Sequence, residues 1–269
     1  MAHIYVVGNT VPEVWERSVV ECWEKGDPFR TEYDKPDDPQ SKDCTALLVV
    51  RDPLRESRIH RAFPGGLDDL EIYRQEVLYG VHDHWVDPDA GKWSYTYHQR
   101  LTAYDTGDTL IDQLDFVVGK LADTPHSRRA QAITWKPDID PDVDDPACLQ
   151  RMWFRIDGSG RLVLQVSMRS NDAFKAAFMN MFAFTELQKL VAERIAERSG
   201  RPVGVGEYTH FANSYHIYGS YFDEFKGFLD TLETREFCDR VWRSDSDIVQ
   251  QNFEYGRQRL AAEQKNGRD

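Results

Sequence analysis

The segment between residues 148 and 170 contains the pattern that most restricts the fold of this chain. Apolar residues recur at every second position over 152–156 and again over 162–168, and Asp-Gly-Ser-Gly stands between the two runs. This alternation around a glycine-rich turn predicts a β-hairpin. Cys148 precedes the first strand and Arg169 follows the second, and the two ends of a hairpin are neighbours in space. We therefore expect the thiol and the guanidinium to lie close together.

The rest of the chain alternates between strand and helix patterns. Pro12 suits the first turn of a helix, Asp172 is placed to cap the longest helix, and Gly200 is placed to end it. The sequence predicts strands over 3–9, 45–53, 130–135, 206–212 and 216–218, helices over 11–25, 67–80, 111–122, 172–198 and from about 222, a surface loop over 26–44, and irregular structure over 81–109. The expected fold is a mixed α/β chain with a substantial sheet.

Composition excludes several classes of protein. The 269 residues are 41% hydrophobic and no Pro/Gly/Ser-rich linker divides them, so we expect one compact domain over residues 1–269. A net charge of −13 argues against broad binding of nucleic acid or anionic membranes. The four cysteines form no CxxC pair and no apolar stretch approaches about 18 residues, which favours a cytoplasmic protein without a membrane span. His82 and His84 lack a third ligand at supporting spacing, so no metal site is expected.

Four separated segments carry side chains suited to nucleotide chemistry. In chain order they are Ser127-Arg128-Arg129 with Trp135, Pro146-Ala147-Cys148, Arg169-Ser170-Asn171-Asp172 with Asn180, and Ser214-Tyr215-His216-Ile217-Tyr218. Their order and spacing resemble those of thymidylate synthases over about residues 110–220, with a weaker similarity from 67 to 109. The resemblance implies a three-layer α/β sandwich whose large mixed sheet packs against a second copy in a homodimer.

Pyrimidine chemistry explains why a thiol is needed. The ring is a poor nucleophile at C5, and addition of a thiolate at C6 makes C5 enamine-like, so that it attacks an activated one-carbon unit. A neighbouring guanidinium favours the thiolate, so we expect Cys148 to be the nucleophile and Arg169 its activator. For a lone cysteine, an inert buried thiol is the alternative. The resemblance implies a pyrimidine nucleoside monophosphate as substrate and 5,10-methylenetetrahydrofolate as one-carbon donor.

Arginine side chains are expected to bind the nucleotide phosphate, because planar guanidinium groups bond oxygens in pairs. The resemblance implies that Arg128 and Arg129 reach across the dimer interface to the partner's nucleotide. It also implies that Arg169 and Ser170 bind the same phosphate from within the subunit. Arg51 is a further candidate for a phosphate contact. For the adjacent arginines alone, a solvated basic pair is the alternative.

The resemblance also assigns residues to the sugar and the base. His216 and Tyr218 share one face of a strand, and such a pair binds the sugar 3′-hydroxyl in the family. Asn180 aligns with the asparagine that reads the uracil edge, but an amide both donates and accepts, so it can serve either uracil or cytosine. Ala176 is small and leaves room for a ribose 2′-hydroxyl. Either Lys136 or Lys175 is expected to bond this hydroxyl.

Proton transfer and folate binding are expected from other positions. Glu76 precedes a short apolar run, as does the family's general acid/base, although Glu71 lies one helical segment earlier and remains an alternative. The resemblance implies that Trp135, Trp85 and Asp172 lie near the pyrimidine and the folate. For these residues, core packing and helix capping are the alternatives.

Departures from the synthases point to one branch of the superfamily. Leu149 stands where synthases usually carry His, Ser214 stands where Asp is usual, and the sequence ends in the polar AAEQKNGRD instead of an apolar tail. In a site that admits water, water is expected to add to the one-carbon intermediate. In a closed site, the folate delivers a hydride to the same intermediate. The sequence therefore resembles the CMP and dCMP 5-hydroxymethylases, including those of antibiotic biosynthesis. A thymidylate synthase acting on dUMP and an inactive nucleotide- or RNA-binding relative remain the alternatives.

Overall fold

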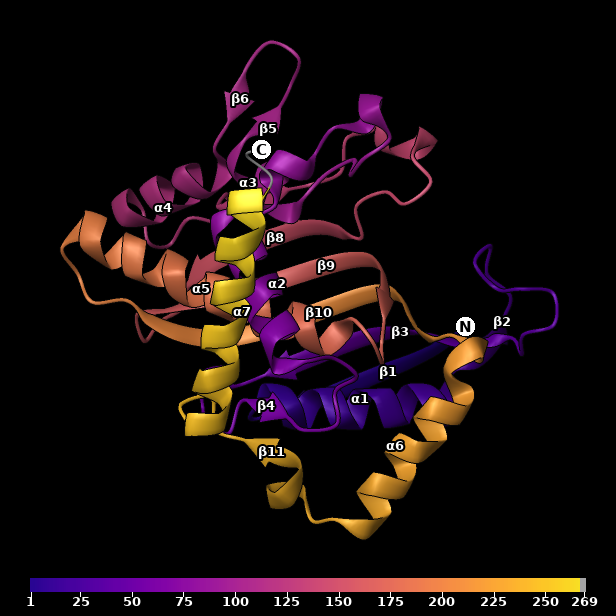
Figure 1. Cartoon of the computed structure of the whole chain (residues 1–269). Helices are drawn as coiled ribbons and strands as arrows, with labels where there is room; N and C mark the ends of the chain where they lie inside the picture. Colours follow the sequence, from indigo (N-terminus) through magenta and orange to yellow (C-terminus); the bar gives the residue numbers. More distant parts are fainter. Residues whose placement is uncertain (267–269) are drawn as a thin grey trace.

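The structure, a computed structural model, describes residues 1–266. Its centre is a seven-stranded sheet of order β1-β3-β10-β9-β8-β7, with β2 paired to β3 (Figure 1). β1 lies parallel to β3 and β10 parallel to β9, whereas the other neighbours are antiparallel. The strands are β1 (Ala2–Gly8), β2 (Asp27–Phe29), β3 (Ser41–Val50), β7 (Gln131–Ile133), β8 (Leu149–Ile156), β9 (Arg161–Asp172) and β10 (Gly204–Ile217). The predicted mixed α/β fold with a large mixed sheet is confirmed.

Helices and two short ribbons complete the fold. The helices are α1 (Val11–Lys25), α2 (Leu67–Tyr79), α3 (Tyr97–Thr102), α4 (Gln113–Asp123), α5 (Ala177–Ser199), α6 (Phe222–Thr234) and α7 (Asp247–Asn266). The ribbons are β4 (Ile59–His60) with β11 (Val241–Trp242), and β5 (Tyr104–Asp105) with β6 (Leu110–Ile111). α7 packs on α2, so the C-terminal helix lies against the helix that carries Glu76 (Figure 1).

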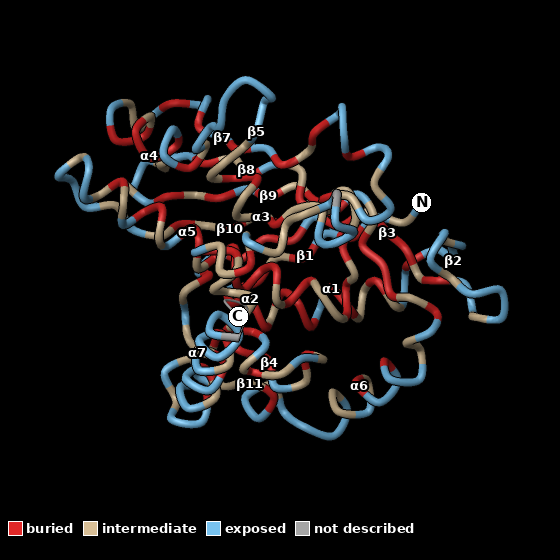
Figure 2. Tube along the Cα trace, turned by 45° about the horizontal axis from the view of Figure 1, so that its top comes forward, coloured by how far each residue is buried: buried red, intermediate tan, exposed pale blue. Residues whose placement is uncertain are grey.

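The core lies between one face of the sheet and the helices. α1 packs on β1 and β3, and α5 packs on β9 and β10. Thr10 caps α1 by accepting a hydrogen bond from the backbone N–H of Glu13. The buried indole of Trp15 donates to the carbonyl of Ala173 at 2.9 Å, which ties α1 to the segment that precedes α5. Buried residues accordingly concentrate in the strands and in these helices, as Figure 2 shows.

The opposite face of the sheet is partly exposed. The strand register places Tyr5, Leu47, Phe211 and Ser167 in one row across β1, β3, β10 and β9. Tyr5 is 64% exposed and Leu47 38% exposed, whereas their chain neighbours on the other face are buried. Alternation of this kind identifies a sheet with one face packed by helices and one face without them.

Several sequence-based boundaries were wrong. Ser41 already begins β3 and β2 lies inside 26–44, because these residues pair along the sheet edge in spite of their polar composition. The two strands expected from 206 onward are one strand, β10, whose register shifts between Ala212 and Tyr215. Ile111 belongs to the exposed ribbon β6 rather than to the buried stripe of α4. The region 81–109 also contains the short helix α3, which Thr96 caps.

Candidate active site

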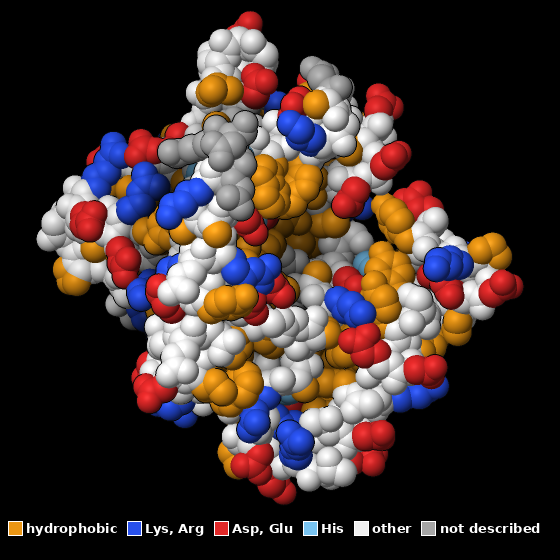
Figure 3. Space-filling model, in the orientation of Figure 1, with side chains coloured by type: hydrophobic (Ala, Val, Ile, Leu, Met, Phe, Trp, Pro, Cys, Tyr) orange, Lys and Arg blue, Asp and Glu red, His pale blue; other side chains and the backbone are white. Residues whose placement is uncertain are grey.

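One cavity of about 880 Å³ opens where β9 and β10 end. These strands are parallel and pair His216 with Asp172, so their last residues reach the same edge of the sheet. α2, α5 and the loops over 92–97 and 142–148 form the other walls. Figure 3 shows a hollow near the centre of the face of the molecule that it draws, with hydrophobic side chains around the opening. Eight predicted site residues line the cavity, namely Glu76, Cys148, Ser170, Asp172, Ala176, Asn180, His216 and Tyr218.

The other predicted site residues do not line it. Arg51, Arg128 and Arg129 are exposed elsewhere on the subunit. Lys136 is buried with its ammonium 3.7 Å from Asp105, so the structure does not bring it to the sugar position that we expected. Lys175 lines the cavity instead.

The two tryptophans and Arg169 also do not line the cavity. Trp135 is half-buried, and its carbonyl accepts a hydrogen bond from the hydroxyl of Tyr104 at 2.9 Å. Trp85 stacks on the ring of His82, with centroids 4.0 Å apart. Neither indole lines the cavity, whereas Trp93 does.

The hairpin holds Cys148 beside Arg169, as expected. The backbone N–H of Arg169 donates to the carbonyl of Cys148 at 2.8 Å. The guanidinium donates to the carbonyls of Pro146 and Ala147. Arg169 therefore fixes the turn that presents the thiol to the cavity, in addition to placing a positive charge beside it.

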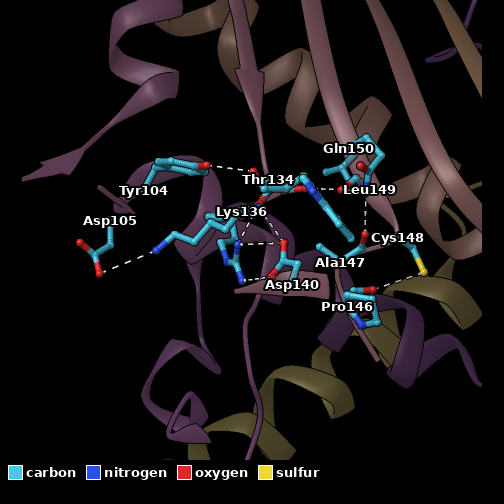
Figure 4. A network of polar contacts seen from close by, with 12 residues as sticks. Tyr104, Asp105, Thr134, Lys136, Asp140, Pro146, Ala147, Cys148, Leu149 and Gln150 are labelled. Carbon is cyan, nitrogen blue, oxygen red and sulfur yellow. Dashed lines mark hydrogen bonds and ion pairs between the residues drawn. The ribbon is translucent and has the colours of Figure 1, made fainter. Parts of the chain in front are cut away.

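A buried polar network fixes the same segment from behind (Figure 4). Arg100 donates to Asp140, with Nη2 and Oδ1 2.6 Å apart, and to the carbonyl of Thr134 at 2.8 Å. The hydroxyl of Thr134 donates in turn to the carbonyl of Leu149. The amide of Gln150 donates to the carbonyl of Ala147 at 2.7 Å. The residues on both sides of Cys148 are thus held by hydrogen bonds to their backbone.

Burial opposes ionisation of the Cys148 thiol. Burial raises its pKa above the usual range, Arg169 lowers it, and Asp145 raises it further. The expected activation by Arg169 is present but smaller than the cost of burial.

The two candidate glutamates have different surroundings. Glu71 is fully buried, and its carboxylate accepts hydrogen bonds from Arg74, Gln75 and Arg257. Glu76 lines the cavity, and its Oε2 lies 2.8 Å from Nδ1 of His82. Glu76 is therefore the glutamate of the pair that faces the cavity, and Glu71 joins α2 to α7.

Asp172 does not cap α5, because the helix begins five residues later. Its carboxylate accepts from the backbone N–H groups of Phe174 and Lys175 at 3.0 and 2.8 Å. Burial nevertheless raises its pKa to about 6. The cavity thus contains a carboxyl group that changes charge near neutral pH.

Asn180 is oriented by a residue that the sequence did not single out. The hydroxyl of Tyr73, on α2, donates to Oδ1 of Asn180. Burial raises the pKa of Tyr73 well above its usual range, so the phenol keeps its proton and remains a donor. Tyr73 lies one helical turn before Glu76, and this spacing was the available signal.

His216 is oriented through Ser214. The hydroxyl of Ser214 donates to Asp43, and Nδ1 of His216 lies 3.1 Å from the same hydroxyl oxygen. Burial lowers the pKa of His216 to about 4, so the ring is neutral at pH 7. Because the serine proton is used by Asp43, the imidazole proton is on Nδ1. Nε2 is then an acceptor, and it is buried without a partner among the described residues.

Comparison with known proteins identifies the family. The sequence profile for thymidylate synthase matches residues 68–254. The chain belongs to the thymidylate synthase family. A candidate thymidylate synthase of Methanocaldococcus jannaschii is 31% identical over 214 residues, which cover 78% of this chain and 88% of that protein. A second one, of Methanopyrus kandleri, is 29% identical over 223 residues, which cover 80% and 93%.

The likeness to this family extends to the fold. Thermostable thymidylate synthase A from Bacillus subtilis superposes with a TM-score of 0.60, covering 81% of this chain and 83% of that chain at 21% identity. Family membership makes the protein a thymidylate synthase-like one-carbon transferase that acts in pyrimidine nucleotide metabolism.

Two kinds of feature are absent from the part of the chain that the structure describes. Within residues 1–266, no helix is both long and apolar enough to cross a membrane. In the same residues, no group of three or more His, Cys, Asp or Glu side chains is arranged to hold a metal ion.

Proposed function

We propose that the protein transfers a one-carbon unit from 5,10-methylenetetrahydrofolate to C5 of a cytidine nucleotide, CMP or dCMP, and adds water to give a 5-hydroxymethyl nucleotide. One observation carries the choice of base. The hydroxyl of Tyr73 donates to Oδ1 of Asn180, which leaves the amide N–H groups of Asn180 to meet the ligand.

The base edges differ at the position that such an amide reads. N3 of cytosine is an acceptor, whereas N3 of uracil carries a hydrogen and is a donor. An asparagine that offers its amide N–H groups complements cytosine and opposes the uracil N3–H, because two donors face each other. The orientation of Asn180 therefore favours a cytosine base over the uracil of dUMP.

The sugar contacts follow from His216, Tyr218 and the start of α5. His216 lines the cavity, and its buried Nε2 is an acceptor without a partner among the described residues, which supports a bond to a sugar hydroxyl once the nucleotide is bound. Ala176 is small and lines the same cavity as Lys175, which supports CMP as the preferred substrate. Ala176→Leu is expected to lower the ratio of kcat/KM for CMP to that for dCMP about tenfold, since the larger side chain occupies the space of the 2′-hydroxyl. An unchanged ratio in steady-state assays would exclude this role of Ala176.

The chain's own residues account for the covalent chemistry. The thiolate of Cys148 forms a bond to C6, and the carbanion character at C5 then takes up the one-carbon unit that the folate supplies. Loss of the C5 proton, addition of water to the transferred carbon and release of Cys148 give the 5-hydroxymethyl nucleotide and tetrahydrofolate. Glu76 is the group in the cavity proposed to move these protons.

The cavity fits both reactants. Its volume of about 880 Å³ suffices for a nucleotide and a pterin together. Trp93, Tyr95 and Tyr97 form an aromatic wall against which a flat ring can stack. Arg128 and Arg129 are exposed away from the cavity of their own subunit. In a homodimer they are proposed to bind the phosphate of the nucleotide in the partner subunit's cavity.

Tritium release from C5 tests the proposal. CMP, dCMP and dUMP labelled at C5 are each incubated with methylenetetrahydrofolate, and products are identified by mass. Release from CMP or dCMP with gain of one hydroxymethyl group and no dihydrofolate is the expected result. Release from dUMP with dihydrofolate would assign a thymidylate synthase, the activity carried by the names of the relatives. Absence of release from all three, with nucleotide binding retained, would assign a binding protein.

A further inference from the structure

We propose that His82 is a positioning residue that holds Glu76 for proton transfer in the active site. The inference rests on the proposed function, because it concerns the glutamate to which that function assigns the protons. Nδ1 of His82 lies 2.8 Å from Oε2 of Glu76. An ionised carboxylate only accepts hydrogen bonds, so the proton of this bond is on Nδ1. Among the described residues, no other side chain hydrogen-bonds the Glu76 carboxylate, and Oε1 is left for the cavity that Glu76 lines.

The backbone brings His82 to Glu76 by a sharp reversal. α2 ends at Gly80, whose φ of 63° lies in the left-handed region. A Cβ at Gly80 would lie 2.2 Å from Nδ1 of His98 and 2.3 Å from Oδ2 of Asp83, so the turn requires glycine. The backbone N–H of Trp85 then donates to the carbonyl of His82 at 2.8 Å, which closes the next turn.

Packing fixes the orientation of the ring. The imidazole of His82 is 5% exposed and stacks on Trp85, with centroids 4.0 Å apart and planes 10° from parallel. Trp93 approaches the same ring edge-on at 5.8 Å. A ring that contacts two indoles cannot rotate without losing these contacts, so the direction of the Nδ1–H is set before substrate binds.

The far side of the ring meets the C-terminal helix. Nε2 of His82 is buried without a hydrogen-bond partner among the described residues, and it lies 3.6 Å from Oε2 of Glu263 on α7. A buried polar atom without a hydrogen-bond partner costs free energy, so this edge of the ring does not add to stability. With the proton on Nδ1, Nε2 is an acceptor, so Glu263 lies beside the ring without a hydrogen bond to it.

Two substitutions separate the hydrogen bond from the stacking. His82→Phe keeps an aromatic ring against Trp85 and loses the donor. His82→Asn loses the ring and keeps an N–H donor near the position of Nδ1. His84→Asn is the matched control, since His84 is exposed two residues away and its ring does not contact Glu76.

The readouts are steady-state tritium release from C5 and covalent trapping of Cys148 by a 5-fluoropyrimidine nucleotide with methylenetetrahydrofolate. For His82→Phe we expect kcat to fall about 10- to 100-fold with KM for the nucleotide changed less than about twofold, because a hydrogen bond to a charged group is lost. Trapping should persist, and His82→Asn should recover most of kcat. His82→Phe with wild-type kcat, or His82→Asn no better than His82→Phe, would overturn the inference while the proposed function stands. Absence of release and trapping in the wild type would overturn both.

Discussion

Asp172 links the chemistry of the site to the stability of the fold. Burial raises its pKa to about 6, whereas an unfolded aspartate ionises near pH ~3.9. The unfolded state therefore loses this proton first as pH rises, and the native state is progressively destabilised between about pH 4 and 6. Asp172→Asn keeps the Oδ1 acceptor and removes the ionisation. We expect its free energy of unfolding to exceed that of the wild type by about 3 kcal/mol at pH 7.5 and by little near pH 4.

Urea denaturation at the two pH values measures this difference. A stability difference that is the same at both would show that folding does not raise the pKa of Asp172. Loss of activity in the variant is a separate readout, since a carboxylate near the base is also expected to serve the reaction.

Tyr73→Phe tests the origin of base selectivity at the level of one hydroxyl group. The substitution keeps the ring and removes the donor to Asn180, so the amide is free to present its oxygen to a uracil N3–H. We expect the preference for CMP over UMP, measured as a ratio of kcat/KM, to fall about tenfold, which corresponds to ~1.4 kcal/mol. Tyr95→Phe, at another phenol of the cavity, is the matched comparison. Equal ratios in wild type and Tyr73→Phe would place the selectivity elsewhere.

The sequence predicted contacts between residues that one local element brings together. It missed contacts between residues that lie on separate elements of the chain. The proximity of Cys148 and Arg169 followed from one hairpin, and their backbone bond confirms it. Tyr73 and His82 were missed because their contacts with Asn180 and Glu76 depend on how α2 and the turn at Gly80 are placed in space. Lys136 was one of two lysines expected at the sugar 2′-hydroxyl, but its ammonium lies 3.7 Å from Asp105 instead.

At the level of elements, a buried ion pair holds the segment before β8. Arg100 and Asp140 are 5% and 0% exposed, and they connect α3 to the loop that leads to Cys148. Asp140→Ala leaves the guanidinium buried without its partner, so we expect a loss of about 3 kcal/mol in the free energy of unfolding. The nucleophile should also be misplaced, and trapping by a 5-fluoropyrimidine nucleotide should slow.

The double variant Arg100→Met/Asp140→Ala separates charge from packing. Removing both charges should recover most of the lost stability, because a buried pair is replaced by apolar contacts. If the double variant is as unstable as the single one, the segment depends on the shape of the pair and not on its charge.

Helices and strands were predicted correctly where the local sequence pattern was strong. The β8–β9 hairpin, α1, α2 and the end of α5 at Gly200 appeared where alternation, Pro12 and glycine indicated them. β2 and the early start of β3 were missed because edge pairing, which no local pattern reports, holds these polar residues. The strand β10 was divided in two because its register shift interrupts the alternation.

At the scale of the molecule, the helix-free sheet face is the surface expected to join two copies. Its row of Tyr5, Leu47 and Phe211 is apolar and runs from the edge strand β1 across β3 to β10. Leu47→Glu introduces a charge on this face, and we expect a dimer by sedimentation velocity to become a monomer. Leu110→Glu is the control, because Leu110 is 69% exposed on the separate ribbon β6. A wild-type monomer would refute the sheet interface.

Exchange of subunits tests whether Arg128 and Arg129 complete the partner's site. A Cys148→Ala protein and an Arg128→Ala/Arg129→Ala protein are each expected to be inactive alone. After they are mixed in equal amounts under conditions that exchange subunits, half of the dimers are hybrids, and each hybrid has one site with both an intact thiol and intact arginines from the other copy. Activity should then return to about a quarter of the wild-type level. If the arginines acted within their own subunit, no site in a hybrid would combine them with the thiol, and the mixture would stay inactive.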